Sequence, residues 1–217
     1  MDVLPVGSQA FTLAADSAVI PVGQISSPAF AITGQTSGSA QLIARASGFS
    51  QATSTVQVGL PKLLASYGTL NLPVGGLPMT VYVSTADQTG SLRGVAADVT
   101  VNNAISDPSV VQVDVTSQVI SAGTYQTMFQ FSGLQKGSAQ VVFSATGYTP
   151  DTMVVQVDSG QLQIVNPPSA LGPQQSALAQ TYVQLSYTTS TPITVNLASS
   201  NPSVLTVTPS VVIPPSY

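Results

Sequence analysis

Short runs in which hydrophobic and polar residues alternate recur along the whole chain, separated by Gly, Pro, Asn, Asp and Ser. Val81 and Val83, for example, alternate with Tyr82 and Ser84. Successive side chains of a β-strand point to opposite faces, so each run predicts a strand with one buried face. In the central part we expect strands near residues 60–66, 69–73, 79–84, 97–102, 109–115, 117–121, 126–132, 138–145 and 151–157. No stretch has helical spacing with caps, so we expect essentially no helix.

Several short strings occur twice at nearly constant spacing. Gly-Ser-Ala-Gln stands at 38–41 and 137–140, Val-Gln-Val at 56–58 and 155–157, and Asx-Pro-Ser-Val at 107–110 and 201–204. Apolar positions are also kept: Phe30 and Ile32 stand where Phe129 and Phe131 stand one repeat later. Self-similarity at a fixed period indicates an array of structural modules.

Seven to nine short strands in about 100 residues, with turns every 8–12 residues, are typical of an immunoglobulin-like sandwich. The sequence therefore predicts an all-β chain of tandem immunoglobulin-like β-sandwich modules with antiparallel sheets. Residues 59–157 are expected to form a complete module, residues 1–58 the C-terminal half of a module, and residues 158–217 the N-terminal half of a further one. The junctions at 59–61 and 158–160 are short, so neighbouring modules should be closely coupled.

The repeated turn residues carry predictions of their own. Gly137 and Gly147, like their earlier copies Gly38 and Gly48, lie between predicted strands, where a turn with positive φ would require glycine. Asp107-Pro-Ser and Asn201-Pro-Ser predict turns in which the Asx side chain bonds to nearby groups.

Charge is scarce and narrows the classes of function. Only 6% of the 217 residues are charged, with 4 Lys+Arg and a formal net charge of −4. Nucleic-acid binding needs clustered Lys and Arg and is not expected. No apolar run approaches the ~20 residues that span a bilayer, and the N-terminus lacks the features of a signal peptide. It looks like a start placed inside a longer protein.

The side chains that most often perform catalysis are missing. The chain has no His, no Cys and no Glu, which removes Ser-His and Cys-His nucleophile pairs, thiolate sites and His-based metal sites. Asp114, Asp151 and Asp158 show no pairing typical of an acid and a base, so we expect no enzyme and no catalytic residue. Too few clustered carboxylates are present for Ca²⁺, and no metal or other cofactor is expected. A Lys–Asn crosslink involving Lys62, Asn102 or Asn103 and Asp98 is disfavoured, because a solvated lysine is commoner.

One irregular segment is a candidate for binding. The loop from Thr85 to Gly94 is the longest in the central module and contains Asp87, Gln88 and Arg93. Loops at one end of a sandwich commonly carry recognition. We therefore select these three residues as a candidate ligand-binding site, with an unknown host or surface glycan or protein as ligand.

The string from Ser200 to Pro214 and that from Gly137 to Tyr148 resemble the tandem bacterial Ig-like repeats of secreted and cell-surface proteins. These are similar in fold to the stalk modules of intimin- and invasin-like adhesins. The resemblance covers nearly the whole chain and rests on turn and core residues. It implies an extracellular or cell-surface setting and a structural or adhesive spacer with no catalytic residue. The alternative is an accessory or ligand-binding module of a larger secreted carbohydrate-active or other hydrolytic enzyme.

The expected partners are neighbouring Ig-like modules of the same protein. Each predicted half module would expose an apolar face and an unpaired strand edge. The two halves are complementary but would lie at opposite ends of the complete module. We therefore expect either head-to-tail self-association between molecules or poorly ordered ends.

Overall fold

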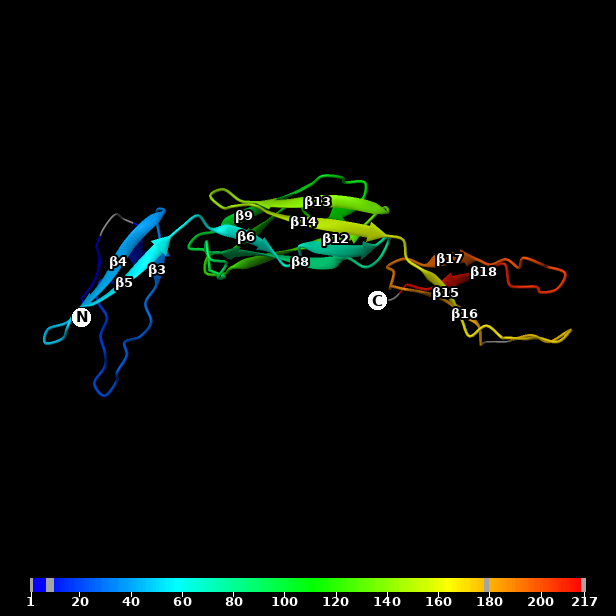
Figure 1. Cartoon of the computed structure of the whole chain (residues 1–217), viewed down its shortest axis with the longest axis horizontal. Helices are drawn as coiled ribbons and strands as arrows, with labels where there is room; N and C mark the ends of the chain where they lie inside the picture. Colours follow the sequence, from blue (N-terminus) through cyan, green and yellow to red (C-terminus); the bar gives the residue numbers. More distant parts are fainter. Residues whose placement is uncertain (1, 7–9, 178–179, 216–217) are drawn as a thin grey trace.

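The computed structural model describes residues 2–6, 10–177 and 180–215, with the backbone alone for residues 2–6. Within these ranges the regular structure consists of β-strands, and no helix is present. The strands form three units that follow one another along an elongated molecule (Figure 1). The prediction of an all-β chain without helix is confirmed, and no helix in the described part is long and apolar enough to cross a membrane.

The middle unit is a sandwich of two sheets. The four-stranded sheet has the order β10 (Val111–Val113), β12 (Gln126–Gly133), β8 (Met79–Ala86) and β6 (Lys62–Ala65). The five-stranded sheet has the order β11 (Ser117–Ile120), β9 (Val99–Ile105), β13 (Gly137–Ser144), β14 (Asp151–Asp158) and β7 (Thr69–Pro73). All pairs are antiparallel except β14 with β7, which is parallel. The sheets are therefore antiparallel as predicted, with one exception at an edge.

The core of the middle unit lies between the two sheets. Three aromatic rings form its centre: the centroid of Phe143 is 5.5 Å from that of Phe129 and 6.2 Å from that of Phe131. Val81 and Val83 are fully buried beside them, whereas Tyr82 between them is exposed. The period-2 pattern thus identified the inward face correctly, because a pleated strand can bury only alternate side chains.

The glycine predictions are half right. Gly147 has a φ of 80° and its earlier copy Gly48 a φ of 82°, in the turns after β13 and β4 (Gly38–Arg45). Gly137 is different, because it is the first residue of β13 and lies outside the left-handed region. A Cβ atom on Gly137 would lie 2.8 Å from Cγ2 of Val110. Close packing explains this glycine, and the prediction of a turn with positive φ was wrong.

Both predicted Asx turns are present. In the first, Oδ1 of Asp107 accepts hydrogen bonds from the backbone N–H (3.0 Å) and the hydroxyl (2.6 Å) of Ser109. In the second, Oδ1 of Asn201 accepts a hydrogen bond from the hydroxyl of Ser203 at 2.6 Å. The bonds to Ser109 lower the pKa of Asp107, because they stabilise its charged form.

The first unit repeats the later strands of the middle unit. Its sheets are β1 (Asp2–Val6), β4 and β5 (Ala52–Val58), and β2 (Phe11–Leu13) with β3 (Ile32–Gly34). The register of β4 with β5 matches that of β13 with β14, since Gly38 faces Val58 as Gly137 faces Val157. Likewise Phe11 faces Gly34 as Val111 faces Gly133. Strands β1 to β5 are therefore the counterparts of β9, β10, β12, β13 and β14.

The third unit repeats earlier strands of the middle unit. It contains β15 (Leu162–Val165) paired with β16 (Tyr182–Leu185), and β17 (Ile193–Asn196) paired with β18 (Ser210–Ile213). Leu162 faces Leu185 as Leu63 faces Thr85, and Asn196 faces Ser210 as Asn102 faces Ser117. These strands are the counterparts of β6, β8, β9 and β11. The division into modules at 58/59 and 157/158 stays a prediction; β14 itself runs one residue further, to Asp158.

Candidate functional site

The carboxylate of Asp87 lies at the centre of the 85–94 loop. Its Oδ1 accepts hydrogen bonds from the Thr89 hydroxyl (2.6 Å), the Thr89 N–H (2.9 Å) and the Ser91 N–H (3.1 Å). The backbone of the loop is closed as well, because the N–H of Asp87 donates to the Ser91 carbonyl and that of Gly90 donates to the Asp87 carbonyl. A φ of 93° at Gly90 permits this tight turn.

Arg93 completes the loop from its other end. Its Nε lies 3.0 Å from Oδ2 of Asp87, and the two side chains are 67% and 30% exposed. The pKa of Asp87 is lowered to about 2, chiefly by the Thr89 hydroxyl, with smaller contributions from the Ser91 and Arg93 bonds and an opposing one from desolvation. The buried Thr85 hydroxyl donates to the Arg93 carbonyl at 2.7 Å. Both charges selected for ligand binding are therefore engaged within the loop.

The third residue of the candidate site, Gln88, faces the linker that precedes the middle unit. Its side chain lies so close to Gly59 that a Cβ atom there would overlap it. On the same side, the Nζ of Lys62 would lie 3.6 Å from a Cβ atom on Gly90. The structure brings Asp87 and Arg93 together and turns Gln88 towards the 59–61 junction. Whether the loop binds a ligand stays a prediction.

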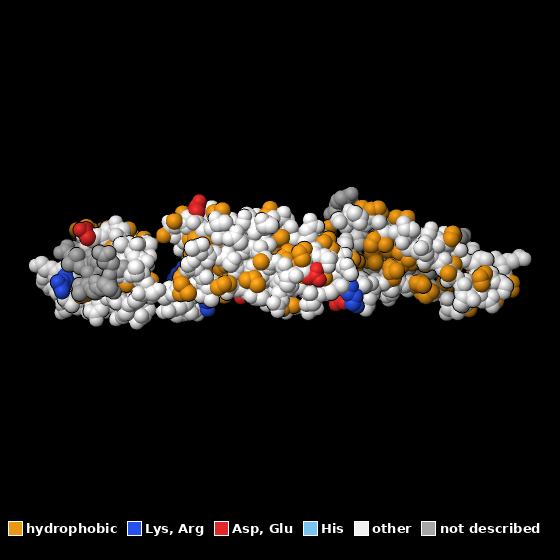
Figure 2. All heavy atoms as spheres, turned by 90° about the horizontal axis from the view of Figure 1, so that it is seen from above, with side chains coloured by type: hydrophobic (Ala, Val, Ile, Leu, Met, Phe, Trp, Pro, Cys, Tyr) orange, Lys and Arg blue, Asp and Glu red, His pale blue; other side chains and the backbone are white. Residues whose placement is uncertain are grey.

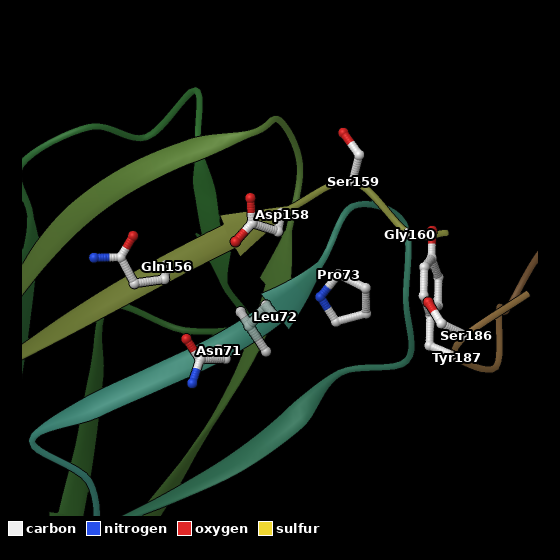
Figure 3. A pocket seen from close by; sticks show the side chains of 9 residues that line it. All are labelled: Asn71, Leu72, Pro73, Gln156, Asp158, Ser159, Gly160, Ser186 and Tyr187. Atoms are coloured by element: carbon white, nitrogen blue, oxygen red, sulfur yellow. The ribbon is translucent and has the colours of Figure 1, made fainter. Parts of the chain in front are cut away.

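A second feature occurs where the middle unit meets the third. The Tyr187 hydroxyl donates a hydrogen bond to the Val74 carbonyl at 2.8 Å, and Gly76 forms an antiparallel bridge with Thr189. The Tyr187 ring stands against Gly160, where a Cβ atom would overlap it. Figure 3 shows the ring beside Pro73, at the end of β7.

A shallow cavity of about 270 Å³ lies at this contact. It is lined by residues from both units: Asn71, Leu72, Pro73, Gln156, Asp158, Ser159, Gly160, Ser186 and Tyr187. Asp158 forms an exposed ion pair with Lys136 at 3.4 Å. A lone carboxylate among amide and hydroxyl groups offers neither an acid–base pair nor a metal ligand set.

The remaining carboxylates of the middle unit bond to backbone groups. Oδ2 of Asp151 accepts the Ala65 N–H at 2.7 Å, Oδ1 of Asp114 accepts the Gln130 N–H at 3.0 Å, and Oδ1 of Asp98 accepts the Ala122 N–H at 2.8 Å. These carboxylates therefore tie neighbouring segments of the middle unit together. Across the described ranges, no three His, Cys, Asp or Glu side chains gather as a metal site would require.

The residues weighed for a Lys–Asn crosslink lie on different sheets. Lys62 begins β6 of the four-stranded sheet, whereas Asn102 and Asn103 belong to β9 of the five-stranded sheet. The Asn103 amide donates to the Val115 carbonyl at 2.8 Å. The described contacts give no support to this chemistry.

Sequence reasoning missed the junction formed by Tyr187, Gly160 and Val74. The contact joins residues more than 100 positions apart in the sequence, and no local pattern marks it.

Comparisons with known proteins add little to this geometry. No family model matches the chain, and a search of curated protein sequences finds no match. Among solved structures, the chain is similar to domains 4 and 5 of the S-layer protein SbsC, with a TM-score of 0.37 and 18% identity over 58% of this chain and 68% of that one.

Two further similarities are of the same strength. Domains 4–9 of the surface layer protein SbsC match with a TM-score of 0.39 and 14% identity over 92% of this chain and 31% of that one. A β-glycosidase from Bacteroides vulgatus matches with a TM-score of 0.39 and 12% identity over 62% of this chain and 20% of that one. With TM-scores below 0.5, these similarities carry no argument about function. What the fold itself defines is a class: an all-β protein of sandwich-type units arranged in series.

Proposed function

We propose that this chain is a non-catalytic spacer or stalk segment built from Ig-like repeats, in a secreted or surface-anchored bacterial protein. The observation that carries the proposal is the serial arrangement of the units, with a hydrogen-bonded contact where the middle unit meets the third (Figure 1). A spacer has to hold its ends apart, so the stiffness of its junctions is its functional property.

The junction around Tyr187 supports this role. The hydrogen bond from Tyr187 to Val74 and the bridge between Gly76 and Thr189 join the loops after β7 and β16, and the Tyr187 ring packs on Gly160 of the linker itself. Thr189 is buried, and its hydroxyl donates to the Thr191 carbonyl at 2.8 Å. Contacts spread over several residues restrict bending more than a single linker contact could.

The amino-acid composition is consistent with a non-catalytic spacer outside the cell. With charged residues at 6% of the chain and no His, Cys or Glu, its polar residues are mainly Ser, Thr, Gln and Asn. Without His, Cys and Glu, the Ser and Thr hydroxyls have no His base beside them, and Ser-His and Cys-His pairs cannot form. A chain without cysteine also keeps its structure whatever the redox state outside the cell.

Small-angle X-ray scattering on the monomeric chain tests the proposal. A compact protein of this length would have a radius of gyration of about 17 Å, and we expect a value well above this. Tyr187→Phe removes the hydroxyl bond and should lower the radius of gyration and blur the fine features of the distance distribution, because the junction bends more freely. Tyr182→Phe, at an exposed tyrosine of β16, is the matched control and should change nothing. A compact wild type, or identical profiles for Tyr187→Phe and wild type, would contradict a stiff spacer.

A further inference from the structure

Two apolar faces that are buried in the middle unit are open in the other two. Leu63 of β6 is 1% exposed, whereas its counterpart Leu162 of β15 is 55% exposed. In the first unit, Phe30 and Ile32 are 37% and 41% exposed, whereas their counterparts Phe129 and Phe131 are both fully buried. The same sequence positions therefore lack the cover that they have in the middle unit.

The middle unit shows what provides that cover. There β12 pairs with β8, and β8 pairs with β6, so the four-stranded sheet needs all three strands. The first unit has the counterpart of β12, namely β3, and the third unit has the counterparts of β6 and β8, namely β15 and β16. For the four-stranded sheet, each end unit thus contains strands that the other one lacks.

An edge strand shows the same complementarity. In the middle unit β7 pairs only with β14. The first unit has the counterpart of β14, which is β5, and β5 is an edge strand. In the third unit, the described residues between β15 and β16 form no strand. A segment that can pair only with a β14-type strand stays irregular where that strand is missing.

We propose that the third unit of one molecule docks onto the first unit of a second copy, so that β16 of the one pairs with β3 of the other and completes the four-stranded sheet. The inference rests on strand equivalence and burial and does not depend on the proposed function. The occupant of each open face is the complementary unit of another copy, by strand addition at a sheet edge.

The position of the units makes this association head-to-tail. The first and third units lie at opposite ends of the molecule, with the middle unit between them (Figure 1). Hydrophobic side chains gather on the third unit, next to the middle one (Figure 2). Two different surfaces that meet in this way form a heterologous interface, and such an interface extends into open chains when the rotation does not close.

The pairing of β12 with β8 in the middle unit predicts which residues of the two copies would face each other. In the middle unit Gln130 faces Thr80, and the Gln130 amide donates to the Thr80 hydroxyl at 2.8 Å. The counterparts are Ala31 in the first unit and Gln180 in the third. We therefore expect Ala31 of one copy to lie directly opposite Gln180 of the next, at a separation that a disulfide can span.

Light scattering on the full chain gives the first test. The mass should rise with concentration above the 22.1 kDa of one chain. Ile32→Asp places a charge on the open apolar face of the first unit, and Leu162→Asp does the same on that of the third unit. Each variant alone should therefore be monomeric. An equimolar mixture should stop at a dimer, because one intact face of each kind remains. Met128→Asp, at an exposed residue of the middle unit, is the control and should associate like wild type.

Cysteine crosslinking provides a test that does not depend on how these variants fold. The chain contains no Cys, so Ala31→Cys/Gln180→Cys is the only thiol pair present and should give a ladder of oxidised oligomers. Ala31→Cys/Gln184→Cys, four residues out of register, should give little ladder. A wild type that stays monomeric at all concentrations, association that both Asp variants retain, or a disulfide formed within one chain would each overturn the proposal.

Discussion

At the scale of single residues, the carboxylates of this chain act as hydrogen-bond acceptors for its own backbone. Asp87 and Asp107 close turns, while Asp114 and Asp151 tie the N–H groups of other segments to their strands. An ionised carboxylate makes stronger hydrogen bonds than a neutral acceptor. The few carboxylates of the chain thus lie at turns and strand ends, where backbone N–H donors would otherwise have no partner.

Asp87 gives a prediction that pH can test. Its pKa of about 2 lies below the ordinary value of 3.8 because its charged form accepts several hydrogen bonds. The stabilisation of the loop is therefore present above pH 3.8 and is lost as the pH falls towards 2. An NMR titration should show the Asp87 carboxylate and the Thr89 and Ser91 amides titrating together near pH 2. Asp87→Asn should remove that transition, and a midpoint near 3.8 in the wild type would contradict the loop geometry.

At the scale of elements, the alternating pattern located the strands of the middle unit well. Strand β7 lies at 69–73 and β11 at 117–120, against predictions of 69–73 and 117–121. Period-2 burial is a local property, so a single sequence contains it. The parallel pairing of β7 with β14 could not be predicted in this way, because it depends on how distant segments meet.

The role of Gly137 was misjudged for the same reason. Its neighbours in sequence suggest a turn. A glycine is required there, however, because the side chain of Val110, just before β10, packs against Gly137. The Asp107 turn brings Val110 to this place, since the Val110 N–H donates to the Asp107 carbonyl at 3.2 Å. A tertiary contact of this kind leaves no local signal.

Substitution at two glycines separates packing from backbone strain. Gly137→Ala should destabilise the middle unit by about 1–3 kcal/mol through overpacking, and Val110→Ala in the same chain should restore part of the loss. Gly123 has a φ of 82° and an open Cβ position, so Gly123→Ala should cost about 1–2 kcal/mol through left-handed strain. Val110→Ala should not rescue it. Urea unfolding of the four variants measures both effects, and equal behaviour at the two sites would contradict this distinction.

At the scale of the whole molecule, the three units differ in completeness although their sequences repeat. The first and third units reproduce strand pairs of the middle unit in the same register. Parts of their apolar faces stay open because neither unit contains all the strands of the four-stranded sheet, which cover the same positions in the middle unit. The repeats could be read from the sequence, whereas the junction at Tyr187 could not, since it depends on how two units are oriented.

The small number of ion pairs in the whole molecule predicts how its thermal stability responds to salt. Two ion pairs are present among the described residues, Arg93 with Asp87 and Lys136 with Asp158, and both have at least one largely exposed partner. Exposed pairs contribute about 0–1 kcal/mol, and salt screens them. Burial of the Phe129, Phe131 and Phe143 cluster, together with the backbone ladders, therefore carries the stability of the middle unit.

We expect the thermal midpoint of the middle unit to change by no more than about 2–4 °C between low and high NaCl. NaCl is the suitable salt, because sulfate would strengthen apolar burial and hide the electrostatic effect. Circular dichroism at a concentration where the chain is monomeric gives the midpoint. Lys136→Gln, which removes one exposed pair, should leave both the midpoint and its salt dependence unchanged. A fall of many degrees on adding NaCl would mean that charge interactions, and not the core, hold the sandwich together.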